Sequence, residues 1–409
     1  MKKFVVLLML VSLVLAGTAL AKKTEITFWT LFGGGEGYIM SEFVKEFNET
    51  HPEIQVTEQI VDWDEYYNKL LTSMLAEEAP DVCIMHLAVI PDYASRGVLN
   101  PIEKYVTEIF TEQYLPNILE QAKYDGHLMA LPLDTHPLVL YYNKKVLREA
   151  GLVDENGEVL IPETWEDMLE YSKIVKEKTG KAGLSVESST MVGERWWIAL
   201  YTQYGGKFYD PITKKVSIDR DIAIKAYKTI LEFYTSNVTP IGDYEDGEAL
   251  FMNDEAAFHL NGVWAMAVYP ITEGLDFGVT VVPAVKGSKH YTWGDSHSLI
   301  FPRAGKVDTK KLEAAVTFAK WIVEHSYEWA KAGHLPVVKS VRESEEFLNL
   351  PMRNNYMEAA KLAVLAPSIR GWSEFRTEMW ETCQSMFIGD ITPEKAADLI
   401  IEKANDILW

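Results

Sequence analysis

The alternation of apolar, strand-like runs with amphipathic helical segments most constrains the fold of this chain. The run from Ile26 to Phe32 is apolar and rich in β-prone residues, and glycines end it. Ile39, Phe43 and Phe47 then recur four residues apart, which predicts a helix with one side facing a core. A strand is then expected at 54–60, a helix at 63–77 and another strand at 82–85. This order predicts an α/β fold with a largely parallel sheet, whose ligand crevice lies beyond the carboxyl ends of the strands.

The first 21 residues have the pattern of a secretory signal peptide. Lys2 and Lys3 precede an apolar run from Phe4 to Ala16, and small residues lead to Ala21. The apolar run is shorter than the roughly 20 residues that a membrane span needs. No Cys stands directly after the small residues, where a lipid would be attached, so no lipid anchor is expected. The sequence predicts a periplasmic protein that is not tied to the membrane.

Length and charge narrow the class of protein further. At 409 residues the chain exceeds the roughly 250–300 residues at which one hydrophobic core usually divides, so two domains are expected. The formal net charge of −21 disfavours binding to nucleic acid or anionic lipid. Cys83 and Cys383 lie in apolar surroundings 300 positions apart, and we expect two buried, unpaired thiols.

Later segments continue the α/β pattern. A strand is expected at 138–143 and an extended stretch at 277–283. Thr164 followed by Asp167 three residues later has the spacing of a capping box at the start of a helix. No internal repeat or low-complexity segment interrupts the chain.

A set of ordered motifs then resembles one known family. The motifs are Ile26 to Trp29, Phe47 to Val56, Ala79 to Val82, Leu131-Pro132, Tyr141 to Asn143, Pro162 to Trp165, Gly205-Gly206 and Asn261 to Trp264. Their order resembles that of extracellular solute-binding protein family 1, the maltose-binding-protein-like sugar-binding proteins of ABC importers. The resemblance implies a two-lobed periplasmic-binding-protein fold of type II, with a ligand cleft between the lobes and three interlobe crossings.

Matching the family landmarks divides the chain between the lobes. The N-lobe is expected at 22–133 plus 284–331 and the C-lobe at 138–279 plus 336–409. Hinges are expected near 134–138, 277–283 and 332–338. The resemblance also implies that the chain is a monomer that captures a carbohydrate or polyol, delivers it to a membrane permease, catalyses nothing and needs no cofactor.

A sugar receptor needs aromatic plates for the apolar faces of the sugar and polar groups for its hydroxyls. The family places a stacking Trp at Trp264, and it places a Trp and an Arg near the cleft at Trp372 and Arg376. Trp196 or Trp197 would supply another plate, with Glu194 beside them. Because 12 Trp and 20 Tyr also have a core to fill, core packing is the alternative for Trp264. For Trp372 and Arg376 the alternative is a surface Trp covered by the stem of the Arg side chain.

The N-lobe offers glycine backbone and polar side chains. Gly34, in the turn from Gly33 to Gly37, presents backbone N–H groups, although a turn that only permits tight packing is an alternative. Glu36 and Asp62 with Trp63 are candidates for the sugar hydroxyls, and Asp62 is equally suited to capping a helix. Trp293 and His297 follow the second expected crossing and are further candidates, although a buried His with its hydrogen bonds satisfied is the alternative for His297.

The sequence also departs from the maltose-binding pattern. Met85, Ala88 and Val89 stand where that branch has a Trp, an Asp and an Arg, and His136 stands at its acidic hinge position. His86 and His136 are therefore candidates for a different set of polar contacts to the ligand, which disfavours maltose itself as the ligand.

Two other ligands remain possible with the same fold. Glycerol-phosphate would use Arg370 and Arg376, and a polyamine would use Glu36, Asp62 and Glu194.

An enzyme and a metal protein are weaker alternatives. The stretch from Gly294 to His297 resembles the start of a serine hydrolase motif, with Ser296 as nucleophile, but no Asp has a His three residues later and the Gly-x-Ser-x-Gly elbow is absent. The nine His are scattered and form no metal-binding motif, so no metal site is expected.

Overall fold

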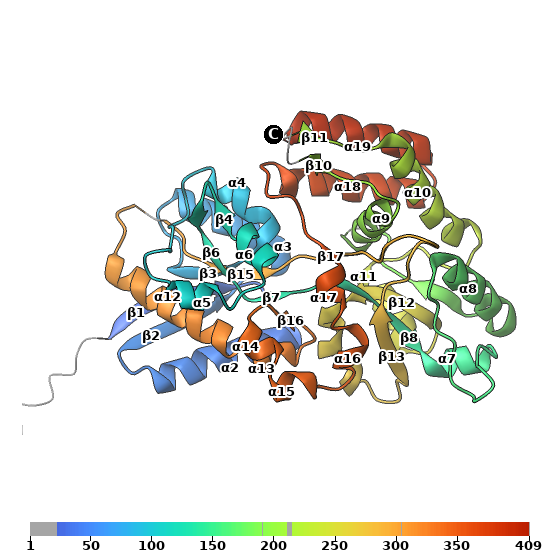
Figure 1. The fold of residues 1–409 in the computed structure, drawn as a ribbon, viewed down its shortest axis with the longest axis horizontal. Coiled ribbons are helices and arrows are strands. Elements are labelled where there is room, and N and C mark those ends of the chain that lie inside the picture. Colours follow the sequence, from blue (N-terminus) through green and yellow to red (C-terminus); the bar gives the residue numbers. More distant parts are fainter. Residues whose placement is uncertain (1–22, 190, 211–214, 304, 409) are drawn as a thin grey trace, which may run out of the picture.

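The computed structural model describes residues 23–189, 191–210, 215–303 and 305–408. The predicted signal peptide lies outside these residues. The chain forms two lobes, each built on its own sheet (Figure 1). Blue and cyan elements from the N-terminal third form one lobe together with orange helices from later in the chain, and green and yellow elements form the other lobe together with the red C-terminal helices.

The N-lobe sheet has the strand order β2-β1-β3-β15-β6. Its strands are β1 (Thr24–Thr30), β2 (Ile54–Ile60), β3 (Val82–His86), β6 (Ala130–Pro132) and β15 (His297–Ile300). β1 runs parallel to β2 and β3, whereas β15 runs antiparallel to β3 and β6. β15 is therefore the one reversed strand of a parallel sheet, and it enters from the other lobe.

Helices cover the N-lobe sheet as the apolar spacing predicts. In α2 (Gly34–Thr50), Met40 and Val44 are buried beside Phe43 and Phe47. In α3 (Trp63–Leu75), Tyr66, Leu70 and Met74 are buried on one face. The remaining helical and short strand segments of this lobe are η1 (Leu87–Val89), α4 (Ile90–Ala94), α5 (Glu108–Thr111), α6 (Pro116–Gln121), β4 (Lys123–Tyr124), β5 (His127–Leu128), α12 (Thr309–Glu324), α13 (Ser326–Ala330) and α14 (Lys339–Arg342).

The C-lobe sheet has the strand order β13-β8-β12-β9. Its strands are β8 (Leu138–Asn143), β9 (Ala182–Ser185), β12 (Ala256–Gly262) and β13 (Phe277–Val281). β8 is antiparallel to β12 and β13, and β9 is parallel to β12. β8 is thus the reversed strand here, and it also begins immediately after a passage between lobes.

Helices pack on both faces of the C-lobe sheet. α8 (Trp165–Thr179) begins with the predicted capping box between Thr164 and Asp167. The other helical and short strand segments are α7 (Lys144–Glu149), α9 (Met191–Gln203), β10 (Tyr209–Asp210), β11 (Lys215–Val216), α10 (Arg220–Thr235), α11 (Tyr244–Met252), η2 (Val263–Ala267), η3 (Tyr269–Ile271), α15 (Glu345–Leu348), α16 (Arg353–Tyr356), α17 (Ala359–Leu362), α18 (Trp372–Phe387) and α19 (Pro393–Ile407). Cys83 and Cys383 are buried and unpaired in the two cores, as expected.

Three segments of chain lie side by side between the lobes. β7 (Asp134–Thr135) pairs antiparallel with β16 (Leu335–Pro336). The backbone N–H of His136 donates to Asp295 O at 3.0 Å, which adds the segment before β15. A further short pair, β14 (Thr292–Trp293) with β17 (Ala363–Val364), lies beside them.

The position of the second passage is later than the sequence suggests. Residues 277–281 form β13 within the C-lobe sheet, and Val285 and Trp293 still pack in the C-lobe core. The chain reaches the N-lobe sheet only at His297. The pairing therefore favours a passage near 294–297 rather than 277–283. Val338 and Val341 also pack in the N-lobe core, although 336–409 is predicted as C-lobe, so the third passage is completed later as well. Among the described residues, no helix is long and apolar enough to cross a membrane.

Candidate functional site

The ends of strands from both lobes meet along one edge, and a cavity opens there. His86 at the end of β3 pairs with His297 at the start of β15, and Gly262 at the end of β12 pairs with Leu138 at the start of β8. In open α/β sheets, ligands bind beyond the carboxyl ends of the parallel strands. A cavity of about 530 Å³ lies there between the lobes, within the size range of small-molecule sites.

The N-lobe wall of the cavity comes from the loops after β1, β2 and β3. Asp62 caps helix α3 by accepting a hydrogen bond from the backbone N–H of Asp64 at 3.1 Å. The cap holds Trp63 at the first helical position, with its side chain 40% exposed and its ring edge-to-face with His86 at 5.5 Å. Glu36, in the first turn of α2, completes this wall. The N-lobe thus presents one aromatic plate among carboxylates.

The C-lobe wall is built around Trp264. Its indole Nε1 donates to the hydroxyl of Tyr244 at 2.9 Å, and the ring lies directly over Gly262. A Cβ at Gly262 would lie 1.9 Å from the Trp264 ring, so only glycine leaves room for this packing. The second aromatic plate is therefore fixed in place before any ligand arrives.

Arg195 is the cationic side chain of this wall. Its guanidinium lies 5.1 Å from the centroid of the Trp264 ring and 4.1 Å from that of Trp293. Burial, together with repulsion from Arg376, lowers the pKa of Arg195 to about 10, so it stays charged at neutral pH. Its Nε is buried without a hydrogen-bond partner among the described residues. The side chain of Arg195 lines the cavity, although Nε itself is enclosed.

Carboxylates outnumber cations around the cavity. Six acidic side chains line it: Glu36, Asp62, Asp64, Glu187, Asp243 and Glu245. Burial, and then the neighbouring His297, lowers the pKa of His86 well below its usual value, so this imidazole is neutral at pH 7. Burial opposes charge on His297 too, but the adjacent Asp134 raises its pKa overall. The cavity therefore offers mostly hydrogen-bond acceptors.

The structure brings together about half of the side chains predicted from the sequence. Those that line the cavity are Glu36, Asp62, Trp63, His86, His136, Trp264 and His297. Gly34 is instead the exposed first residue of α2, and Arg370 lies partly buried in the turn before α18. Trp293 is buried beneath Arg195 and supports the wall from behind.

The other predicted aromatic plates lie in the C-lobe core. Trp196 packs against Trp165 and Phe233, and Trp197 stacks on Tyr201 and Tyr227. Trp372 packs edge-to-face against Phe208 and Phe375. None of these three side chains lines the cavity, because the helices that carry them turn these faces toward the core.

Glu194 and Arg376 form a buried ion pair in the same core. Arg376 Nε and Nη2 donate to the two carboxylate oxygens of Glu194 at 3.0 and 3.3 Å, and Trp380 Nε1 donates to Glu194 at 2.9 Å. Burial opposes the charge on Arg376, but Glu194 raises its pKa overall. The pair joins α9 to α18 and does not reach the cavity lining.

Several residues that line the cavity were not predicted from the sequence. They are Asp64, Glu187, Ser189, Met191, Val192, Arg195, Asp243, Tyr244 and Glu245. Met191 and Arg195 are four residues apart on α9 and so share a face. Asp243 carries a detectable signal, because its spacing to Asp246 is that of a capping box at a helix start.

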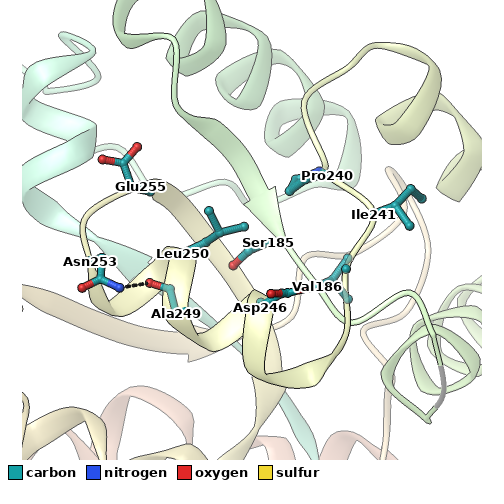
Figure 2. A pocket seen from close by; sticks show the side chains of 11 residues that line it. Ser185, Val186, Pro240, Ile241, Asp246, Ala249, Leu250, Asn253 and Glu255 are labelled. Carbon is teal, nitrogen blue, oxygen red and sulfur yellow. Dashed lines mark hydrogen bonds between the residues drawn. The ribbon is translucent and has the colours of Figure 1, made fainter.

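A second hollow, of about 290 Å³, lies within the C-lobe alone (Figure 2). It lies between the end of β9, the loop containing Pro240 and Ile241, and helix α11. The side chain of Asn253 is already used there, donating to Ala249 O at 2.8 Å. No aromatic side chain lines it, so it lacks the plates that distinguish the interlobe cavity.

Ser296 is not placed for nucleophilic catalysis. Its side chain is fully buried, and its hydroxyl donates to the backbone carbonyl of His297 at 3.1 Å. The hydroxyl does not line the interlobe cavity.

Comparison with known proteins gives the family. The model of the bacterial extracellular solute-binding proteins matches residues 33–328. The maltotriose-binding protein of Pyrococcus abyssi is 25% identical over 84% of this chain and 73% of its own length. The arabinooligosaccharide-binding protein of Bacillus subtilis is 27% identical over 80% of this chain and 81% of its own.

Solved structures share the fold. The GacH receptor of Streptomyces glaucescens, determined without ligand and with acarbose, superimposes with a TM-score of 0.85 at 22% identity, covering 94% of this chain and 98% of its own. The maltotriose-binding protein of Thermus thermophilus gives a TM-score of 0.74 at 24% identity, covering 93% and 100%. These matches confirm the two-lobed α/β fold predicted from the sequence. Because the family model covers well over half of the chain, this protein belongs to the bacterial extracellular solute-binding proteins.

Proposed function

We propose that this protein is the substrate-binding subunit of an ABC importer and captures an oligosaccharide between its lobes. The observation that carries the proposal is the interlobe cavity, in which Trp63 of one lobe and Trp264 of the other are surrounded by carboxylates and one guanidinium. Aromatic rings suit the apolar faces of a sugar, and charged acceptors and donors suit its hydroxyls.

Relatives support this ligand class. Curated relatives bear the names maltotriose-binding and arabinooligosaccharide-binding protein. A cavity of about 530 Å³ with two separate aromatic plates suits more than one sugar ring. An oligosaccharide is therefore the favoured ligand within the carbohydrate class.

Closure of the lobes would follow from the distribution of contacts. A ligand can favour a closed state only by contacts that it makes better there than in the open state. Trp63, Asp62 and Glu36 belong to one lobe, and Trp264 and Arg195 belong to the other, so a ligand that touches both groups would stabilise closure. The hinges would be the three adjacent segments at 134–137, 294–297 and 334–336.

Glycerol-phosphate is the alternative with support among relatives. The sn-glycerol-3-phosphate-binding periplasmic protein of Pectobacterium atrosepticum is 21% identical over 94% of this chain and 91% of its own length. Six carboxylates around the cavity oppose a phosphate, because Arg195 is the one Arg or Lys of the described lining. A polyamine suits the carboxylates but would leave the donor of Arg195 without an acceptor.

The remaining parts of the function rest on the family and on the sequence. We propose that the signal peptide directs export to the periplasm, that the protein acts there as a monomer without catalysis, and that the closed form is recognised by membrane permease subunits. Family members are extracellular or periplasmic solute-binding proteins, which supports this location.

Thermal unfolding of the mature protein against a ligand panel tests the proposal. The panel contains maltotriose, arabinooligosaccharides, shorter sugars, glycerol-phosphate and spermidine. A ligand at 100 times its Kd stabilises the folded state by about 2.7 kcal/mol, which is measurable as a rise in Tm. A shift with an oligosaccharide supports the proposal, whereas a shift only with glycerol-phosphate or spermidine contradicts the sugar assignment.

The variant Trp264→Ala then tests the site. Loss of a central aromatic anchor costs about 2 kcal/mol or more of binding free energy, a loss of roughly 30-fold in affinity. Tyr38→Ala is the matched control, because Tyr38 is 68% exposed on α2 and does not line the cavity. Equal affinities of Trp264→Ala and Tyr38→Ala for the ligand, measured by calorimetry, would show that the sugar stacks elsewhere.

A further inference from the structure

We propose that Asp134, His136, His297 and His334 form a binding site for a divalent transition metal ion, with Zn²⁺ the best fit. The four side chains lie far apart in the sequence, and no spacing motif announces them. The fold brings one ligand atom from each to within 4.8 Å of all the others, and all four residues are buried.

The site lies where the chain passes between the lobes. Asp134 and His136 lie on the segment of β7, His297 begins β15, and His334 directly precedes β16. Gly333, with φ of +102°, brings His334 into place, since a Cβ there would lie 1.9 Å from Val263 O. An ion held by these four residues would therefore join three segments of chain at the hinge.

The distances within the cluster are compatible with a bound metal ion as well as with hydrogen bonds between the side chains. Asp134 Oδ2 lies 2.8 Å from His297 Nδ1 and 3.2 Å from His334 Nδ1, and Asp134 Oδ1 lies 3.1 Å from His136 Nδ1. Zinc bonds to imidazole nitrogen and carboxylate oxygen are about 2.0–2.1 Å long, which places tetrahedral ligands about 3.3 Å apart. These three separations, each from an imidazole nitrogen to one of the two Asp134 oxygens, approach that value. The four ligand atoms together lie within 4.8 Å of one another, so an ion would draw them closer.

His334 gives the sharpest reason for a cation. Its Nε2 lies 2.5 Å from Glu36 Oε1, and since a carboxylate only accepts, Nε2 carries the hydrogen. Nδ1 of the same ring faces the Asp134 carboxylate, with Oδ2 at 3.2 Å. This nitrogen is buried and makes no hydrogen bond among the described residues. A buried polar atom without a partner carries a desolvation cost, and a metal ion bound between Nδ1 and Oδ2 would remove it.

The carboxylate of Asp134 has more donors around it than it can use. The backbone N–H of His297 donates to Oδ1 at 3.0 Å, and Trp329 Nε1 donates to Oδ2 at 2.6 Å. With His136 and His297 also within hydrogen-bond distance, four donors fill the roughly four lone-pair positions of a carboxylate, and a hydrogen on His334 Nδ1 would be a fifth. A metal that replaces the imidazole protons would relieve this excess.

The surroundings resemble the outer shell of a metal site. A metal-bound His commonly donates its other N–H to a carboxylate, which fixes its ring. Glu36 has that position relative to His334, and the Trp329 ring stacks on His334 at 4.4 Å with an interplanar angle of 7°. Three imidazoles with one carboxylate favour zinc and its neighbours over Ca²⁺ or Mg²⁺, which prefer oxygen ligands.

Metal titration of the sugar-free mature protein tests this inference. The protein is produced without a polyhistidine tag, treated with a chelator, and titrated with Zn²⁺ by calorimetry and with Co²⁺ by visible absorption. One equivalent of metal, a chelator-sensitive rise in Tm and the intense visible bands of four-coordinate Co²⁺ are expected. Absence of stoichiometric binding would overturn the inference.

Two variants and one control locate the ion. His334→Ala removes a ligand and should weaken Zn²⁺ binding more than 100-fold, while Glu36→Gln removes only the outer carboxylate and should weaken it roughly 10–100-fold. His127→Ala is the control, because His127 is exposed and pairs with Glu103 far from the cluster. Unchanged affinity in both test variants, or equal loss in His127→Ala, would place the metal elsewhere and refute the site. Since no sugar is present, failure here leaves the proposed sugar function unaffected.

Discussion

Glu194 and Arg195 are neighbours on helix α9, yet their side chains meet opposite environments. Glu194 points toward α18, where Arg376 and Trp380 satisfy its carboxylate. Arg195 points toward the cavity, where its guanidinium lies between the rings of Trp264 and Trp293. The Glu194 carboxylate therefore has its charged partner without a ligand, whereas the Arg195 guanidinium lies against aromatic rings beside the cavity.

The two side chains therefore have different roles: Glu194 supports the packing of two helices, and Arg195 is placed to contact a ligand. A buried charge whose partners are already in place contributes to the packing of α9 against α18. Arg195 lines the cavity, and its Nη2 donates to Met191 Sδ, a weak acceptor that a ligand oxygen would improve on. Variants on the supporting face, around Glu194, should change stability, and variants on the cavity face, around Arg195, should change affinity.

The largest expected effect is on the supporting face. Arg376→Met leaves Glu194 buried with its main charge partner missing, which costs about 3–5 kcal/mol of unfolding free energy. Denaturant unfolding measures this loss, and the affinity of the remaining folded protein for its sugar should change little. The double variant Glu194→Gln with Arg376→Met should recover part of the stability, because no uncompensated charge remains. A single variant as stable as the natural protein would show that the ion pair does not support the wall.

A smaller effect of opposite kind is expected on the cavity face. Arg195→Met keeps the length and the apolar packing between the two indoles but removes the charged donor. Loss of a charged hydrogen bond to the ligand costs about 1.5–3 kcal/mol of binding free energy, roughly 10- to 150-fold in Kd. Calorimetric titration measures the affinity. A large loss of stability with unchanged affinity would reverse the roles assigned to the two faces.

The sequence predicted local structure better than it predicted the cavity. The strand at 54–60, the buried face of α3 and the Thr164 capping box are all present, because each depends on residues close together in the chain. Which of Glu194 and Arg195 faces the cavity depends instead on the rotation of α9 against α18, and the neighbouring residues in the sequence do not determine that rotation.

Aromatic residues and histidines show the same limit. Trp197 and Trp264 are equally suitable plates by composition, but one is enclosed by Tyr201 and Tyr227 while the other has Gly262 beneath it. The short sequence Asn261-Gly262 before Trp264 was the only local sign of that difference. The cluster around Asp134 joins positions up to 200 residues apart, which sequence spacing cannot detect.

The smallest predicted effect concerns how Trp264 is held on the cavity face. Tyr244→Phe leaves the phenyl ring but removes the hydroxyl that accepts from Trp264 Nε1 and Asn261 Nδ2 and donates to Glu248. The part of the loss that concerns the Trp264 plate is one hydrogen bond, about 0.5–1.5 kcal/mol. If the hydrogen bond positions the plate, the loss appears in sugar affinity, and the quenching of Trp fluorescence by the sugar changes as well. If packing over Gly262 and against Arg195 suffices, the loss appears in unfolding free energy alone. The two results distinguish a wall that is positioned by its polar contacts from one that is positioned by shape.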